Sequence, residues 1–319
     1  MRFSDYAHDW LYGENGYYAK TPPIGKRGDF YTSVSASPFF GGAIANHIVR
    51  QIAAGELDED ALICEFGAHG GELTADVAQF IHTIAPKLFA SLRFAIVEPI
   101  AALRERQERY LQEGFGNAIA LAIVPKIDDL SAKSSFVFAN ELFDSFAFDI
   151  IDRGKIAFVE NGAIVWREEA GLEASFRGER FLGYESFAKR LRSRFERCEF
   201  MTFDYGTKEA RGDFSARIYK DHQVFALFEL PTLAPFFQNS DLTADVNFGA
   251  LIEAFRGAGF ETATLKNQNS ALIEMGIAEL LKLYEEKAGF EAYRREVGRV
   301  RTLLDPATLG ERFKMLLVR

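Results

Sequence analysis

The sequence predicts an α/β fold with a mostly parallel sheet, because apolar runs of strand length alternate with segments of helical spacing. The runs at 61–66 and 92–97 are each followed by such a segment, at 73–84 and 100–111. This alternation is typical of parallel strands joined by right-handed crossover helices. Further strands are predicted at 118–124, 135–139, 198–205, 260–265 and 313–318.

The remaining segments predict helices at both ends of this pattern and one interruption inside it. Apolar periodicity predicts a short helix within 1–20 and further helices at 38–54, 246–257 and 270–303. Between 145 and 166, short apolar runs are separated by Gly154 and by Asn161-Gly162. Turns of this composition join antiparallel strands, so we expect a hairpin insertion there.

Composition excludes several classes of function. The chain has 319 residues and a net charge of −9, which disfavours nucleic acid and acidic membrane surfaces as partners. It contains no apolar run long enough to span a membrane and begins without a signal-like segment. Two isolated cysteines fit a reducing compartment, so we expect a cytoplasmic protein. The five histidines lack ligand spacing and predict no metal site, and the sequence leaves the oligomeric state open.

A glycine-rich turn follows the first predicted strand and precedes its helix. It includes Glu65, Gly67, Ala68, His69 and Gly71. Glycine lets the backbone approach a ligand closely, and the following helix directs its N-terminus toward that ligand. Such turns also serve packing alone, so this motif needs support from other strand ends.

Acidic and amide residues follow three other predicted strands, at Glu98, at 140–144 and at 204–206. An acidic residue after the second strand can accept hydrogen bonds from ribose hydroxyls, which predicts a nucleoside cofactor. The residues alone leave NAD and S-adenosylmethionine open. Several carboxylates around one crevice favour the sulfonium cation of S-adenosylmethionine.

The chain also resembles the MidA family of class I S-adenosylmethionine-dependent methyltransferases, one member of which is a mitochondrial complex I assembly factor. The resemblance covers nearly the whole chain in blocks that stand in the family's order. These blocks are Gly28-Asp-Phe30 with Thr32-Ser33, Glu65 to Leu73, Val97-Glu-Pro99 with Leu103, Arg104 and Gln107, Asn140 to Asp144, Asp204 to Gly206, Asp241 to Ala244 with Val246 and Phe248, and Gly310 to Lys314.

The resemblance implies a Rossmann-like class I methyltransferase fold, with a mostly parallel seven-stranded sheet, helices on both faces, and N-terminal and mid-chain insertions. Residues 1–55 would cover the cofactor site, and 56–319 would form the methyltransferase domain. Insertions are expected at about 145–200 and 206–245, and a helical one at about 270–303.

The resemblance also implies roles for individual residues. S-adenosyl-L-methionine would be held by Thr32, Ser33, Glu65, Gly67, Ala68, His69, Gly71, Glu98 and Asn140. The acceptor implied is an arginine of a partner protein, such as a complex I subunit. For catalysis we favour Glu141, with Asn140 orienting the reactants and Asp144 supporting; the alternative for Asp144 is a helix N-cap.

Two other functions stay open on the sequence. A non-enzymatic assembly factor is favoured by His69, a bulky residue in a turn where the family has glycine. An NAD-dependent oxidoreductase is supported only by the glycine-rich turn and Glu98, and it lacks an evident catalytic arrangement.

Overall fold

The computed structural model describes residues 1–20 and 32–319, and the chain divides into two compact units. Among the described residues, unit 1 contains 1–20, 141–188 and 205–258. Unit 2 contains 32–140, 189–204 and 259–319. The chain therefore passes between the units several times, and each unit is built from separate stretches of sequence.

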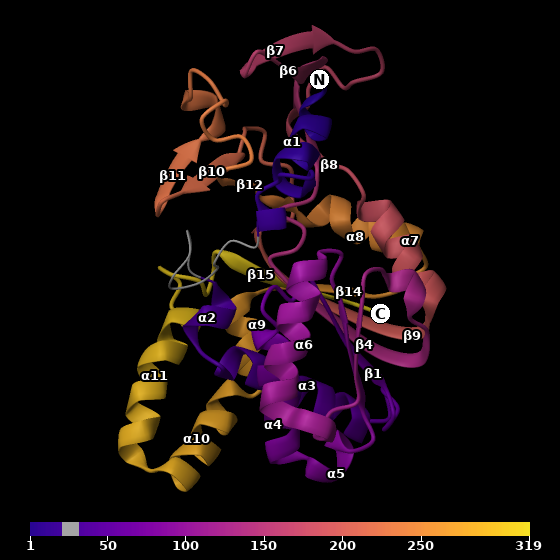
Figure 1. The fold of residues 1–319 in the computed structure, drawn as a ribbon, viewed down its shortest axis with the longest axis vertical. Coiled ribbons are helices and arrows are strands. Elements are labelled where there is room, and N and C mark those ends of the chain that lie inside the picture. The colour runs from indigo at the N-terminus through magenta and orange to yellow at the C-terminus, as the bar shows by residue number, and fades with distance from the viewer. Residues whose placement is uncertain (21–31) are drawn as a thin grey trace. The chain divides into compact units, whose positions relative to one another are not determined.

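Unit 2 is built on the sheet that the alternating pattern predicts. The sheet has eight strands: seven follow the order β14-β15-β9-β4-β1-β2-β3, and β13 pairs with β9 beside this path. Several of its strands are labelled in Figure 1. Strands β9, β4, β1, β2 and β3 pair in parallel, whereas β14 and β15 pair antiparallel. The strands are β1 (Leu62–Phe66), β2 (Arg93–Val97), β3 (Leu121–Val124), β4 (Ala132–Asn140), β9 (Phe195–Thr207), β14 (Ala263–Asn267) and β15 (Phe313–Val318).

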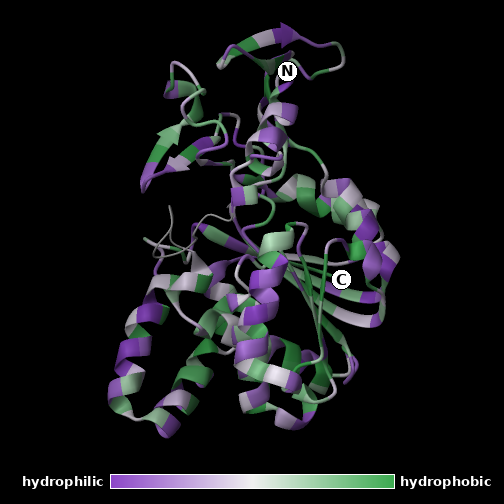
Figure 2. Ribbon diagram, viewed as in Figure 1, coloured by the Kyte–Doolittle hydropathy of each residue, from purple (hydrophilic) through white to green (hydrophobic). Residues whose placement is uncertain are grey.

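The central strands are buried along nearly their whole length. Every residue of β1 is buried, as are the last four residues of β2. Figure 2 shows these strands as hydrophobic, while helices such as α6 and α11 carry hydrophilic residues. Both faces of a parallel strand are covered, so its sequence is a continuous apolar run. The short apolar runs of the sequence therefore predicted this sheet correctly.

The segments of unit 2 that were predicted as helical are helical in the structure, although 270–303 is divided among three helices and two short helices were not predicted. They are α2 (Ser33–Ala36), α3 (Phe39–Ala53), α4 (Glu72–Ile84), α5 (Pro86–Phe89), α6 (Ala101–Phe115), α9 (Gln268–Glu274), α10 (Ile277–Ala288) and α11 (Phe290–Leu304). Glycines bring α3 against α4. A Cβ on Gly41 would lie 2.6 Å from the Cβ of Asp76, and one on Gly42 would lie 2.7 Å from the ring of Phe80. A side chain at either glycine would force the two helices apart.

Unit 1 contains two small antiparallel sheets, in the orders β7-β6-β5-β8 and β11-β10-β12. The predicted hairpins are confirmed: Arg153-Gly154 and Asn161-Gly162 all have positive φ, as tight hairpin turns require. The elements of this unit are α1 (Phe3–Tyr12), β5 (Phe148–Asp152), β6 (Lys155–Glu160), β7 (Ala163–Glu168), β8 (Arg177–Phe181), β10 (Arg217–Lys220), β11 (Gln223–Ala226), β12 (Asp241–Thr243), β13 (Val246–Asn247) and α8 (Phe248–Gly257). Helix α7 (Tyr184–Arg194) begins in unit 1 and ends in unit 2.

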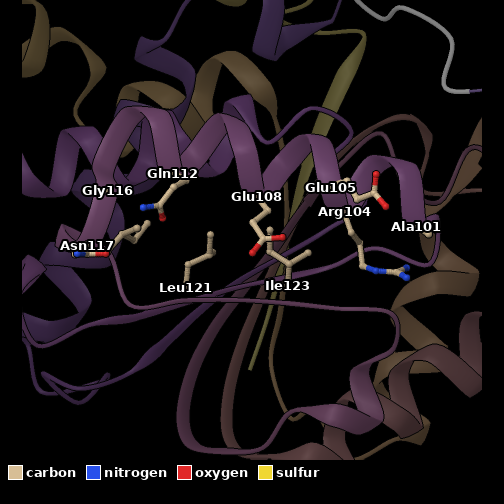
Figure 3. A pocket seen from close by; sticks show the side chains of 10 residues that line it. Ala101, Arg104, Glu105, Glu108, Gln112, Gly116, Asn117, Leu121 and Ile123 are labelled. Atoms are coloured by element: carbon tan, nitrogen blue, oxygen red, sulfur yellow. The ribbon is translucent and has the colours of Figure 1, made fainter.

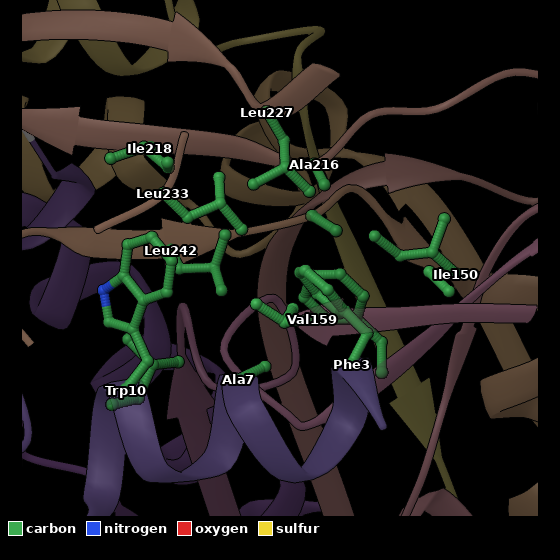
Figure 4. Close-up of a cluster of buried hydrophobic side chains, with 14 of the residues drawn as sticks. Phe3, Ala7, Trp10, Ile150, Val159, Ala216, Ile218, Leu227, Leu233 and Leu242 are labelled. Carbon is green, nitrogen blue, oxygen red and sulfur yellow. The ribbon is translucent and has the colours of Figure 1, made fainter. Parts of the chain in front are cut away.

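The core of unit 1 forms where α1 packs on residues of both sheets. Phe3 and Trp10 are fully buried there, together with Ile150 of β5, Ile218 of β10 and Leu242 of β12 (Figure 4). The indole Nε1 of Trp10 donates to the carbonyl of Ser240 at 2.8 Å, so the buried ring keeps a polar partner. The first helix of the chain is thus an integral part of unit 1.

Three boundaries differ from the sequence-based expectation. The predicted N-terminal segment 1–55 is shared between the units, because α1 packs in unit 1 and α3 in unit 2. The predicted insertion 145–200 extends past its observed end, because the sheet strand β9 already begins at Phe195 and pairs with β4 from there. Glu196 and Arg197 are exposed. Because these two charged residues interrupt the apolar run, the sequence predicted that the strand begins only at 198. Residues 246–247 form β13 before α8, so the predicted helix begins two residues later.

No helix in the described residues has both the length and the apolar character that crossing a bilayer requires.

Replacing Phe3 with alanine tests the role of α1 in unit 1. Because the ring is fully buried, we expect the free energy of unfolding to fall by about 3–5 kcal/mol. Both tryptophans, Trp10 and Trp166, lie in unit 1, so urea unfolding followed by tryptophan fluorescence reports on this unit. The control is Val224→Ala, which removes an exposed side chain of the same unit and should change stability by less than about 0.5 kcal/mol. Equal effects of the two substitutions would show that α1 does not contribute to this core.

Candidate functional site

Three neighbouring parallel strands of unit 2, β1, β2 and β4, end at one edge of its sheet, and β9 continues past this edge to Thr207. The register pairs Phe66 of β1 with Val97 of β2 and with Ala139 of β4, and it pairs Asn140 of β4 with Phe203 of β9. Gly67, Glu98 and Asn140 are therefore level with one another and with Phe203 at this edge. Asp204 lies one residue further along β9. In open α/β sheets, ligands bind outside the carboxyl ends of the strands, so Gly67, Glu98 and Asn140 lie at the edge where a nucleoside is expected to bind.

The glycine-rich turn adopts a tight, left-handed geometry. Gly67, His69 and Gly71 have φ values of +66°, +45° and +89°. The turn is closed by the Gly71 amide, which donates to the Ala68 carbonyl at 2.7 Å, and α4 begins at the next residue. A side chain with a Cβ is disfavoured at positive φ, so His69 occupies a position where glycine would be unstrained.

Glu98 is a buried carboxylate at the end of β2, with 3 % of its surface exposed. Its Oε1 accepts the Ile100 amide at 3.0 Å, and the Arg104 guanidinium donates to its main-chain carbonyl at 2.9 Å. Burial raises the pKa of Glu98, and the hydrogen bonds from Ile100 and Gln107 oppose that rise. The side chain is thus fixed in place with one oxygen engaged by the main chain, as an acceptor for ribose hydroxyls needs to be.

Gln107 of α6 is a contact that the sequence did not assign to the site. Its Nε2 donates to the carbonyl of His69 at 2.9 Å and lies 3.5 Å from Oε2 of Glu98. The signal in the sequence was a polar residue on the apolar stripe of α6, between Leu103 and Leu111. A buried amide in such a stripe indicates a specific hydrogen-bonding role.

Glu65 is buried beneath the turn, and the hydroxyl of Thr74 in α4 donates to its Oε2. Burial raises the pKa of Glu65 to about 8, and the hydrogen bond from Thr74 opposes this rise. The contacts of this carboxyl group tie β1 to α4, so its observed role is to position the turn.

Thr32 and Ser33 make structural contacts within unit 2. The Thr32 hydroxyl accepts the amide of Ser35 in a capping box at the start of α2. The Ser33 hydroxyl donates to Oε1 of Gln268 in α9 at 2.9 Å, and Ser33 is fully buried. The structure therefore uses both hydroxyls to fix α2. The family-like block at 28–30 lies outside the described residues.

The residues predicted for catalysis fall on both sides of the unit boundary. Asn140 ends β4 in unit 2, while Glu141 and Asp144 belong to unit 1. Glu141 has φ of +52°, a conformation that is uncommon for a residue with a side chain. Such strain persists only where surrounding contacts impose it, and it concentrates at functional sites.

Asp144 is buried in unit 1 and accepts the hydroxyl of Tyr205 on Oδ2 at 2.5 Å. Burial raises the pKa of Asp144 to about 6, against the effects of the Tyr205 hydroxyl and the charge of Arg217. The alternative role as a helix N-cap is wrong, because turn residues follow Asp144 and the next element is β5. The pairing with Tyr205, 61 residues away, explains why this carboxylate is buried.

A separate cavity of about 460 Å³ lies between the outer side of α6 and β3 (Figure 3). Leu121 and Ile123 of β3 form its apolar wall, and Arg104, Glu105 and Glu108 of α6 line its polar side. None of the predicted cofactor residues lines it. Among the residues that the structure describes, no group of three or more His, Cys, Asp or Glu side chains is placed to hold a metal ion.

Comparison with known proteins decides which nucleoside this fold uses. Residues 43–177, which contain the turn, Glu98 and Asn140 to Asp144, match a family model described as "Putative S-adenosyl-L-methionine-dependent methyltransferase". This part of the chain is similar to that methyltransferase family. S-adenosyl-L-methionine is therefore the cofactor, and the NAD-dependent alternative is not supported.

The similarity to relatives and to solved structures extends over nearly the whole chain. The chain is 24 % identical over 340 residues to "Protein arginine methyltransferase NDUFAF7, mitochondrial" of Rattus norvegicus, covering 93 % of this chain and 76 % of the rat protein. The Danio rerio protein of the same name is 22 % identical, with 95 % and 79 % covered. A crystal structure of a Burkholderia thailandensis protein bound to S-adenosyl-homocysteine has a TM-score of 0.80 at 22 % identity, covering 100 % of this chain and 88 % of that one. The methyltransferase therefore has the predicted Rossmann-like class I fold.

His69 gives a test of the turn geometry in this methyltransferase. Because φ is positive there, we expect His69→Gly to be more stable than His69→Ala by about 1 kcal/mol. At an ordinary helix or strand position the order reverses, since glycine is then the less stable by about 0.5–1 kcal/mol. Chemical unfolding of the two variants measures the difference, and a more stable alanine variant would contradict the left-handed conformation.

The buried Glu65 predicts a pH-dependent stability. Its pKa rises on folding from 4.5 to about 8, so the folded state binds the proton more tightly than the unfolded state. The contribution of Glu65 to stability is therefore fully present below pH 4.5 and is lost as the pH rises through 8, by at most about 1.4 kcal/mol per pH unit. We expect Glu65→Gln to gain stability over the wild type as the pH rises from 5 to 8, measured by urea unfolding across that range. A difference that stays constant with pH would contradict a raised pKa.

Proposed function

We propose that this methyltransferase transfers a methyl group to an arginine side chain of a partner protein. The observation that carries the proposal is Glu141, a carboxylate held in a strained conformation directly after β4, the central strand that also positions Asn140. The relatives named as protein arginine methyltransferases support the same acceptor at 22–24 % identity.

The chemistry of an arginine acceptor explains why a carboxylate is needed. The guanidinium group is protonated at all physiological pH values and is a weak nucleophile. A carboxylate that receives two parallel N–H bonds fixes the plane of the group and draws positive charge toward itself. The opposite nitrogen then keeps more of its electron density for attack. S-adenosylmethionine supplies an already activated methyl group, so the protein's main task is to orient the acceptor and to exclude water.

The residues of this chain take three roles in the proposal. Glu141 receives the guanidinium group, and Asn140 orients the reacting groups. Asp144, which is buried and bound by the Tyr205 hydroxyl, supports Glu141 in this role. Glu98, with the turn at Gly67 and Gly71, binds the cofactor in unit 2. The acidic character of the chain, with a net charge of −9, favours a cationic protein segment as substrate over nucleic acid.

The partner and the location are further parts of the proposal. The family resemblance makes a respiratory complex I subunit the first partner to test. We propose a cytoplasmic location from the composition, although the relatives are named as mitochondrial proteins. Cell fractionation followed by immunoblotting tests the location, and recovery of the protein only with organelles or membranes would contradict it.

A non-catalytic assembly factor is the second candidate, and His69 favours it. A histidine at a left-handed position of the turn places a half-buried side chain where the cofactor would approach the main chain. Calorimetry with S-adenosylmethionine separates the two functions, since a scaffold would bind its partner without binding the cofactor.

We predict that Glu141→Gln abolishes methyl transfer, with a loss of at least about a hundredfold, while leaving cofactor affinity unchanged. The neutral amide cannot polarise a guanidinium group as a carboxylate does. The measurement is transfer of labelled methyl groups from S-adenosylmethionine to protein in a lysate of a strain that lacks the gene, followed by hydrolysis to identify the methylated amino acid.

The matched control is Glu168→Gln, which makes the same change at an exposed position of unit 1 and should retain full activity. Thermal unfolding of each variant shows whether the fold is intact. Label transfer that survives Glu141→Gln excludes this residue from the chemistry, and label on an amino acid other than arginine contradicts the proposed acceptor.

A further inference from the structure

Gln107 stands out among the buried polar residues of unit 2 because of where its amide lies. Helix α6 is largely exposed, and its buried residues Leu103, Gln107 and Leu111 form one stripe with a spacing of four. Gln107 has no exposed surface at all. A polar side chain in such a stripe is unfavourable unless its hydrogen bonds are made, so its contacts explain why it is tolerated there.

The contacts of Gln107 join the two segments that the cofactor site requires. Its Nε2 donates to the main-chain carbonyl of His69 in the glycine-rich turn at 2.9 Å, and lies 3.5 Å from Oε2 of Glu98. Both partners are acceptors, so the amide must present its nitrogen to them, and this fixes its orientation. The turn follows β1 and the carboxylate follows β2, and one side chain of α6 spans both.

The amide oxygen of Gln107 also indicates a role in the cofactor site. Oε1 of Gln107 is buried and has no hydrogen-bond partner among the described residues. A buried acceptor without a donor is unfavourable, and a bound hydroxyl group or water beside Glu98 would satisfy it. The free energy that the unpaired oxygen costs would be recovered when a ligand with several hydroxyl groups donates a hydrogen bond to it.

The electrostatics of Glu98 agree with this geometry. Burial raises the pKa of Glu98, whereas the Ile100 amide, the Gln107 amide and the charge of Arg104 lower it. Arg104 is the charged side chain that acts on this carboxylate, and it donates to the Glu98 main-chain carbonyl. Gln107 therefore favours the ionised form, which accepts hydrogen bonds from ribose without donating one.

We infer that Gln107 is a positioning residue for cofactor binding, which holds the His69 carbonyl and the Glu98 carboxylate in the single arrangement that accepts the ribose of S-adenosylmethionine. It acts through Glu98 and the turn. The inference rests on the proposed role of Glu98, and the experiment below separates the two.

The test is a double-mutant cycle read out by calorimetry with S-adenosylmethionine. Gln107→Met preserves the length of the side chain and removes both donated hydrogen bonds. We expect it to weaken cofactor binding about tenfold, the equivalent of one hydrogen bond to a charged group. In the Glu98→Gln background the same change should cost less than about threefold, because the carboxylate is already gone and only the contact with the His69 carbonyl is lost. Gln112→Met makes the same substitution at an exposed position five residues along α6 and should leave binding unchanged.

The pH profile gives a second readout that a merely structural role would not alter. Affinity should fall as the pH falls through the pKa of Glu98, because the protonated carboxyl loses acceptor strength. Loss of the Gln107 hydrogen bond raises that pKa, so the fall should begin at a higher pH in Gln107→Met than in the wild type. If the methionine variant does not fold, Gln107→Asn retains an amide that is one methylene too short and should show the same weakening and the same shift.

The possible outcomes are distinct. An equal cost of Gln107→Met in both backgrounds, or an unshifted pH profile, overturns the inference and leaves the role of Glu98 intact. A Glu98→Gln variant that binds S-adenosylmethionine as tightly as the wild type overturns the proposed ribose contact itself.

Discussion

The parallel pairing of β2, β1, β4 and β9 is the constraint on which the candidate site depends. Hydrogen bonds between these strands fix their register, and the register brings Gly67, Glu98, Asn140 and Asp204 to one edge although they are far apart in sequence. A one-residue slip in any pair would turn the last side chain of that strand to the other face of the sheet. Burial of both faces opposes such a slip, so the apolar core of unit 2 also determines the chemistry of its edge.

Strained backbone conformations occur in the loops that follow two of these strands. His69 after β1 and Glu141 after β4 both have positive φ with a side chain present. The first is held by the Gln107 amide on its carbonyl and by the closure of the turn at Gly71. Strained residues of this kind persist because surrounding contacts over-determine them, and they are frequent where the main chain must approach a ligand. The similarity to S-adenosylmethionine-dependent methyltransferases gives that ligand as S-adenosylmethionine.

Unit 1 uses a different means of organising its polar groups. Tyrosine hydroxyls donate to buried or partly buried acceptors, as Tyr205 does to Asp144 and Tyr18 does to Asp241 at 3.0 Å. Below them, α1 closes an apolar core with Phe3 and Trp10. The first helix and the strands near residue 240 are thus interdependent, which accounts for the mixture of distant sequence stretches in this unit.

The sequence alone determined the features that depend on local pattern. Strand β15 lies where its apolar run predicted it, because buried positions require apolar residues. The turns at Arg153-Gly154 and Asn161-Gly162 lie where glycine predicted them, because positive φ favours glycine. Only the tertiary structure decided features that depend on distant partners. The hydroxyls of Thr32 and Ser33 stabilise α2, Asp144 is bound by Tyr205, and Gln107 joins the turn to Glu98. A hydrogen bond between residues tens of positions apart imposes no periodicity on either segment, so only the folded chain reveals which polar side chains meet.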